Sequence, residues 1–121
     1  MATPTFAGAK PRADSADEAT VTWVLTTADP NGAYVTPYGD YADRTLHVFG
    51  TFGGATVVLD GSLDGGTNSE ILTDPQGNAI SKTAAAIEAV LEVVSAIRPR
   101  LSVVGAGATI TCILYMRKAF R

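Results

Sequence analysis

The fold of this chain is most constrained by apolar and polar residues that alternate in short runs, each of which ends near glycine or proline. In residues 20–28, Val21, Trp23 and Leu25 alternate with positions that are mostly threonine, and the same period of two returns in residues 109–116. A period of two is typical of strands that bury one face. The chain is therefore predicted to be mainly β.

Several further strands are expected between these two. Gly53-Gly54 separates the strand-like runs 44–52 and 54–62, so a β-hairpin is expected there. Residues 69–73 indicate a short strand, and the Asp, Pro and Gly residues of 74–78 indicate a turn. Seven or eight short strands joined by such turns predict an antiparallel β-sandwich with a jelly-roll-like arrangement.

Residues 82–97 fit two patterns. The apolar residues from Ile87 to Val94 have the spacing of one helical face, whereas the chain from about residue 95 alternates like a strand. We predict a short helical segment near 83–90 and extended chain after it. Pro99 lacks a backbone N–H donor, so its strand is expected at a sheet edge or with a bulge.

The length of 121 residues indicates one domain. Residues 1–17 contain prolines and charges without an apolar period, so we predict an extended N-terminal arm there and a single domain over 18–121. The longest uncharged run, from Leu101 to Met116, is too short to span a bilayer, and the N-terminus lacks the apolar core of a signal peptide. We therefore expect no membrane partner.

The residue types needed for most catalytic and metal sites are scarce. Cys112 is the only thiol and His47 the only imidazole, which excludes an intrachain disulfide and leaves few zinc ligands. The alternation places Cys112 in a buried strand and His47 on an exposed or interface position. We predict no catalytic residue, no cofactor and no metal ligand, and we do not expect an enzyme.

The segment that begins at Asp60 partly matches a calcium-binding loop. Its first, third, fifth and sixth positions fit, but Ile71 stands where the bidentate glutamate is needed. Strand patterns lie on both sides of it, whereas such a loop needs flanking helices. A glycine-rich turn between strands is therefore the expected structure.

Charge is distributed unevenly along this acidic chain, whose net charge is -3. Residues 45–81 hold four acidic side chains and no basic one, while residues 82–121 hold six basic and two acidic side chains. If these segments lie on different faces, the molecule is a charge dipole that suits a patterned protein surface or its own copies. Scattered, solvated charges are the alternative. The modest basic set lacks interleaved aromatic residues, so nucleic acid is not an expected partner.

Four segments carry a resemblance to a known class of proteins. FGTFGGATVVLDGSLDGG, LTDPQGNAISKTAA, AIRPRLSVVGAG and TITCILYMR are similar to small virion structural proteins of tailed bacteriophages, over about residues 45–118. The resemblance implies a jelly-roll or β-sandwich cement (decoration) protein that binds the outer head surface and staples neighbouring subunits. It also implies the major capsid protein as partner, a homodimer or homotrimer, synthesis in the host cytoplasm and location on the virion surface.

Two regions are expected to make the contacts that this role needs. The N-terminal arm is the candidate clamp, and the tyrosine-rich loop offers aromatic anchors of the kind that dominate interfaces. The same loop, with Asp40 and Asp43, suggests a carbohydrate-binding module as an alternative function, and a head-tail connector or tail component is another. The interface candidates are Phe6, Lys10, Arg12, Tyr34, Tyr38, Tyr41, Arg98 and Arg100.

Overall fold

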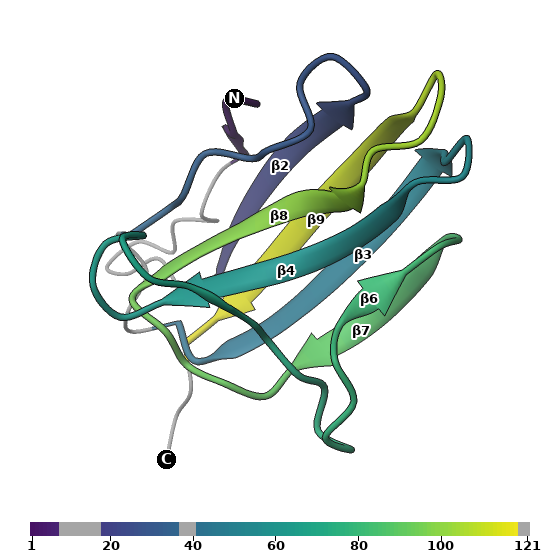
Figure 1. Cartoon of the computed structure of the whole chain (residues 1–121). Coiled ribbons are helices and arrows are strands. Elements are labelled where there is room, and N and C mark those ends of the chain that lie inside the picture. The colour runs from purple at the N-terminus through teal and green to yellow at the C-terminus, as the bar shows by residue number, and fades with distance from the viewer. Residues whose placement is uncertain (8–17, 37–40, 119–121) are drawn as a thin grey trace.

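The computed structural model describes residues 1–7, 18–36 and 41–118, and these residues form nine strands in two antiparallel sheets (Figure 1). No helix occurs in this part of the chain. The prediction of a mainly β protein is therefore confirmed. None of these residues belongs to a helix that could cross a membrane.

The first sheet contains the strands that the alternating pattern predicted. In spatial order it consists of β1 (Thr5–Ala7), β2 (Glu18–Thr26), β9 (Thr109–Arg117), β3 (Asp43–Thr51) and β7 (Ala86–Val90). The apolar residues of β2 pair with apolar residues of β9, as Trp23 does with Cys112 and Leu25 with Ile110. These four side chains are fully buried, so one face of the sheet supplies half of the core.

The second sheet is built around one strand. It consists of β4 (Thr56–Ser62), β5 (Glu70–Ile71), β6 (Ser81–Lys82) and β8 (Ala96–Val103). The pairing of β8 extends along all of β4, whereas β5 and β6 each pair with two residues of it. Residues 31–35 add isolated bridges to the other edge of β8.

The two sheets face each other across a single hydrophobic core, with β4 and β8 in front of β2, β9 and β3 in Figure 1. Trp23, Ile110 and Leu114 from the first sheet share this core with Leu59 and Leu101 from the second. The indole N–H of Trp23 donates a hydrogen bond to the carbonyl of Ala33 at 2.9 Å, which satisfies its polar atom within the core.

The predicted hairpin at Gly53-Gly54 is wrong, because β3 and β4 lie in different sheets. The chain instead crosses between the sheets here, next to the connection between β8 and β9. The N–H of Ala106 donates to the carbonyl of Gly53 at 3.0 Å, so the two crossings pack backbone against backbone. A Cβ atom at Gly53 would lie 2.1 Å from the carbonyl oxygen of Ala106, which explains the glycine.

The predicted helical segment near 83–90 is also wrong, because residues 86–90 form the edge strand β7. Pairing with β3 satisfies the backbone of this segment and overrides the helix preference of its alanines. Only Val90 of this strand is buried, while Ile87, which a helix would have turned toward the core, is 65% exposed. The helical spacing of the apolar residues therefore did not correspond to one buried face.

Pro99 occupies the position that its missing donor requires. Its carbonyl accepts a hydrogen bond from the N–H of Gly32 at 3.0 Å. The N and O atoms of one strand residue point to the same side, so the absent N–H of Pro99 faces residues 31–35 and not β4. As expected, the missing donor faces the edge of β8 that forms only isolated bridges and does not pair with a full strand.

Candidate interaction surfaces

The described part of the predicted N-terminal arm is attached to the domain. Residues Thr5–Ala7 form β1 at the edge of the first sheet, and Ala2 is buried between backbone hydrogen bonds to Asn31 and Ala33. Phe6 pairs in register with Val21 and remains half exposed. Lys10, Arg12 and Tyr38 lie outside the described residues.

Three of the other interface candidates form one cluster on the outside of the second sheet. Arg100 donates from Nε and Nη2 to both carboxylate oxygens of Asp60, at 2.6 and 3.1 Å, and Arg98 Nε donates to Oδ2 at 3.3 Å. The guanidinium of Arg98 lies 4.6 Å from the centre of the Tyr34 ring. These residues therefore hold one another in place within the chain, without a partner.

Burial and charge define what this cluster can do. The side chain of Asp60 is 2% exposed, while those of Arg98 and Arg100 are 18% and 30% exposed. The hydrogen bonds that Arg100 donates to Asp60 raise the pKa of Arg100 above its ordinary value. With two cations and one anion, the cluster presents a small positive surface whose first role is to hold β8 against β4. The buried hydroxyl of Tyr34 has no hydrogen-bond partner among the described residues.

Tyr41 does not present its ring to solvent as the sequence suggested. It is 9% exposed and belongs to the core, and its carbonyl accepts a hydrogen bond from Arg44 Nε at 2.8 Å. Arg44 is itself buried and donates from Nη1 to the carbonyl of Val94 at 3.1 Å, and burial lowers its pKa. Little of the Tyr41 side chain is therefore exposed for stacking against a sugar.

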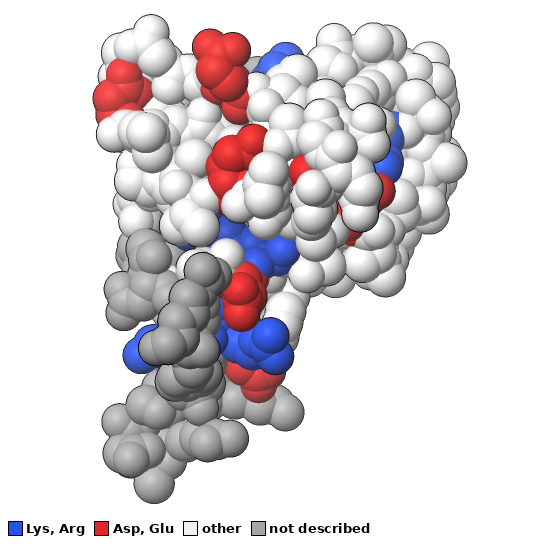
Figure 2. Space-filling view, turned by 90° about the horizontal axis from the view of Figure 1, so that it is seen from below, with Lys and Arg blue, Asp and Glu red and all other residues white. Residues whose placement is uncertain are grey.

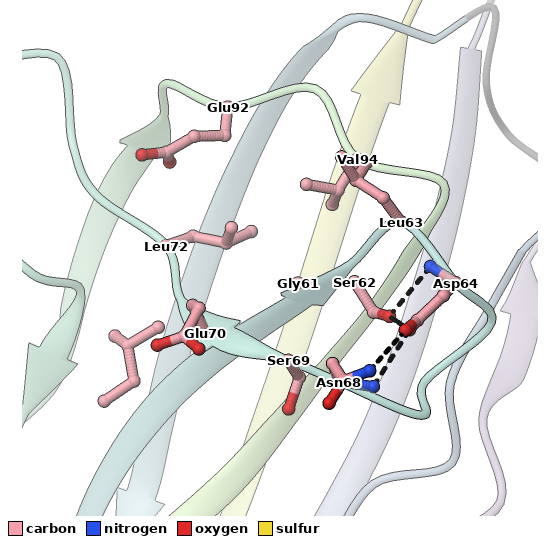
Figure 3. A pocket seen from close by; sticks show the side chains of 11 residues that line it. Gly61, Ser62, Leu63, Asp64, Asn68, Ser69, Glu70, Leu72, Glu92 and Val94 are labelled. Atoms are coloured by element: carbon pink, nitrogen blue, oxygen red, sulfur yellow. Dashed lines mark hydrogen bonds between the residues drawn. The ribbon is translucent and has the colours of Figure 1, made fainter.

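Sequence reasoning missed a groove of about 420 Å³ beside the end of β4 (Figure 3). Leu72 and Val94 project toward it, and Leu63 lies at its border. A second hollow of about 460 Å³ lies on the other side of the 91–94 segment. Apolar side chains around these hollows remain exposed, and we call them the apolar rim: Leu63, Ile71, Leu91 and Val93.

Polar groups fix the loops that border the groove. Asp64 accepts hydrogen bonds from Ser62 and from the backbone and side chain of Asn68. These hydrogen bonds, from Asn68 first, lower the pKa of Asp64 to about 2. Partial desolvation raises the pKa of Glu92, but hydrogen bonds from the backbone and hydroxyl of Thr73 outweigh it and leave that pKa lowered. Both carboxylates are therefore ionised and anchored at neutral pH.

The calcium-like segment forms the glycine-rich turn that was expected. Gly65 and Gly66 have φ values of 75° and 101°, which favour glycine. Asp60, the first candidate ligand, is already occupied by two arginines. No group of three or more metal-binding His, Cys, Asp or Glu side chains occurs within the described ranges.

Charges of opposite sign lie close together at the end of the molecule where β3 begins and β9 ends. Figure 2 shows acidic and basic side chains interspersed on this side and a broad uncharged region beside them. Arg117 donates to Asp43 at 3.4 Å, just as Arg100 pairs with Asp60. Basic residues of the last segment therefore neutralise acidic residues of earlier segments.

Comparison of the chain with protein-family models and with curated proteins finds no match.

Proposed function

We propose that this protein is a structural protein of a bacteriophage virion that binds the outer surface of the head and staples neighbouring major capsid protein subunits. In this proposal the two sheets are a jelly-roll-like β-sandwich that acts as a rigid block. The four segments that resemble phage virion proteins lie within about residues 45–118, a stretch that contains β4 to β9 and most of β3, which is most of the two-sheet framework. This coincidence is the observation that carries the proposal.

The glycines of those segments support it further. Gly53, Gly65, Gly77 and Gly105 all have positive φ and stand at the turns that connect the strands. A backbone in this region strongly favours glycine. The motifs that carry the resemblance therefore contain the glycines that the turns need. A fold shared with phage virion proteins would require the same turns.

The apolar rim is the surface that we assign to the head. Its four exposed side chains surround two hollows, and exposed apolar clusters of this kind commonly mark protein-binding sites. Glu92 lies between Leu91 and Val93, and its hydrogen bonds to Thr73 hold the segment in place. A partner that covers the rim would remove these side chains from water without reordering the loop.

The copy number in purified particles of the source virus tests the proposed function. Quantitative mass spectrometry should give a ratio to the major capsid protein near one or a simple fraction of it. A far lower ratio would favour the alternative of a head-tail connector or tail component. Complete absence from the particles would overturn the proposal.

A binding assay tests the assigned surface. Val93→Asp should lower the occupancy of the protein on heads at least tenfold, because it places a charge in an apolar contact. Val103→Asp is the matched control, since Val103 is 53% exposed, close to the 51% of Val93, and lies at the opposite end of β4 from the rim. Equal occupancy for the two variants would exclude the rim as the head-binding surface.

A further inference from the structure

The outward face of the first sheet lacks charge over its centre. Two adjacent rows of paired residues cross the three long strands there, and no described Lys, Arg, Asp or Glu belongs to either row. We call this surface the uncharged face: Thr22, Ile113 and His47 in one row and Val24, Thr111 and Phe49 in the next.

The charged residues of the three long strands are confined to one end of the same sheet. Glu18, Arg117 and Asp43 form a single row there, at the ends of β2, β9 and β3. Arg117 donates to Asp43, and the hydroxyl of Tyr115 donates to Glu18. These side chains already bind one another, so the centre of the face is left to threonine, aromatic and aliphatic groups.

Such a face is unusual for a surface that stays in water. The solvated face of a sheet generally carries polar or charged residues, whereas the centres of protein interfaces are depleted of charge and enriched in aromatic residues. Here Val24 and Phe49 are exposed on the face, and Ile87 extends it onto β7 in register with His47. The ring of His47 lies against that of Phe49, with centroids 4.7 Å apart.

We propose that the uncharged face binds the same face of a second copy about a two-fold axis, which makes the protein a homodimer. A surface without net charge does not repel its own copy, and threonine hydroxyls both donate and accept hydrogen bonds. Residues on it therefore find complementary groups in an identical partner, as a two-fold interface requires. A charged partner would find no groups of opposite charge at the centre of this face.

The size of the face agrees with this occupant. β2, β9 and β3 each have nine residues, which corresponds to about 30 Å at the usual rise of a strand. With β1 and β7 at its edges, the sheet is about 20 Å wide, or roughly 600 Å² before side-chain relief is counted. A standard interface buries about 800 Å² on each partner. The flat area of the face is below this average but reaches the lower end of the range for specific interfaces, which is about 600 Å² on each partner.

The inference goes beyond the proposed function, because it concerns the free protein and needs no capsid. Analytical ultracentrifugation of the full chain should give twice the mass of the 12.5 kDa chain at micromolar concentration. Thr111→Lys, on the central strand, should raise the dimer dissociation constant more than tenfold. The control Ser102→Lys places the same charge on an exposed position of β8, in the other sheet, and should leave the constant unchanged.

A monomeric or trimeric wild-type protein would overturn the inference, as would a dimer that Thr111→Lys does not weaken. Thr22→Lys on β2 repeats the test if the first variant fails to fold, which circular dichroism would show. Presence or absence in virus particles has no bearing on these results, so the two proposals can fail separately.

Discussion

At the scale of single residues, chemistry and burial explain which sequence predictions succeeded. The strict alternation around Cys112 made its burial predictable, because a free thiol on the inner side of a central strand has no polar role to fulfil. The role of Asp60 was not predictable in this way. Its partners Arg98 and Arg100 are 38 and 40 residues away, and only the pairing of β4 with β8 brings them together.

The Asp60 cluster should be a main source of stability for the second sheet. Asp60→Ala leaves two arginines without their buried counter-ion, which should lower the free energy of unfolding by about 2–4 kcal/mol. Urea unfolding followed by tryptophan fluorescence would measure this loss. Glu70→Ala, at an exposed position, should change it by less than about 0.5 kcal/mol. Similar values for the two variants would show that the cluster does not hold the sheet together.

The Cys112 thiol should be unreactive in the folded protein. Burial raises its pKa to about 12, so the nucleophilic thiolate forms only at a pH far above neutrality. Labelling with an aromatic disulfide reagent at pH 8 should therefore proceed no faster than unfolding and should accelerate in urea. Thr83→Cys provides an exposed thiol as a control and should react at once. Rapid labelling of wild-type protein without urea would contradict the burial of Cys112.

At the scale of elements, local pattern predicted strands but not their partners. β2 and β9 follow from their own alternation, and the turn at residues 74–78 follows from its Asp, Pro and Gly residues. The assignment of β3 and β4 to different sheets depends on the contact between two distant crossings, which no local pattern contains. The groove and the apolar rim were missed for the same reason, because their residues come from β4, β5, the loop between them and the 91–94 segment.

The crossing between β3 and β4 gives a prediction with a built-in control. Gly53 and Gly54 both have positive φ, at 57° and 85°, so alanine at either should be strained by about 1–2 kcal/mol. At Gly53 the new Cβ would also meet the Ala106 carbonyl, whereas nothing lies within 4 Å at Gly54. Gly53→Ala should therefore lower the free energy of unfolding by about 3 kcal/mol or more, measured by urea unfolding. Equal losses would mean that the two crossings do not touch.

At the scale of the whole molecule, the two proposed surfaces belong to different parts of the fold. The uncharged face lies on the first sheet, while the apolar rim surrounds the end of β4 and the 91–94 segment. Ion pairs such as Arg100 with Asp60 join segments of opposite charge, and Figure 2 shows acidic and basic side chains interspersed on one side of the molecule. Both proposed contacts therefore rely on uncharged side chains and not on ion pairs.

A dimer formed through the uncharged face would carry two apolar rims, and this leads to a prediction about attachment. If both rims reach the same head, the second contact forms at a high effective concentration and strengthens binding without any new contact. The monomeric variant Thr111→Lys, whose rim is intact, should then need roughly tenfold or more protein to occupy heads to the same extent. Ser102→Lys should bind like the wild type. If Thr111→Lys is monomeric and occupies heads as well as the dimer does, only one rim of each dimer contacts the capsid.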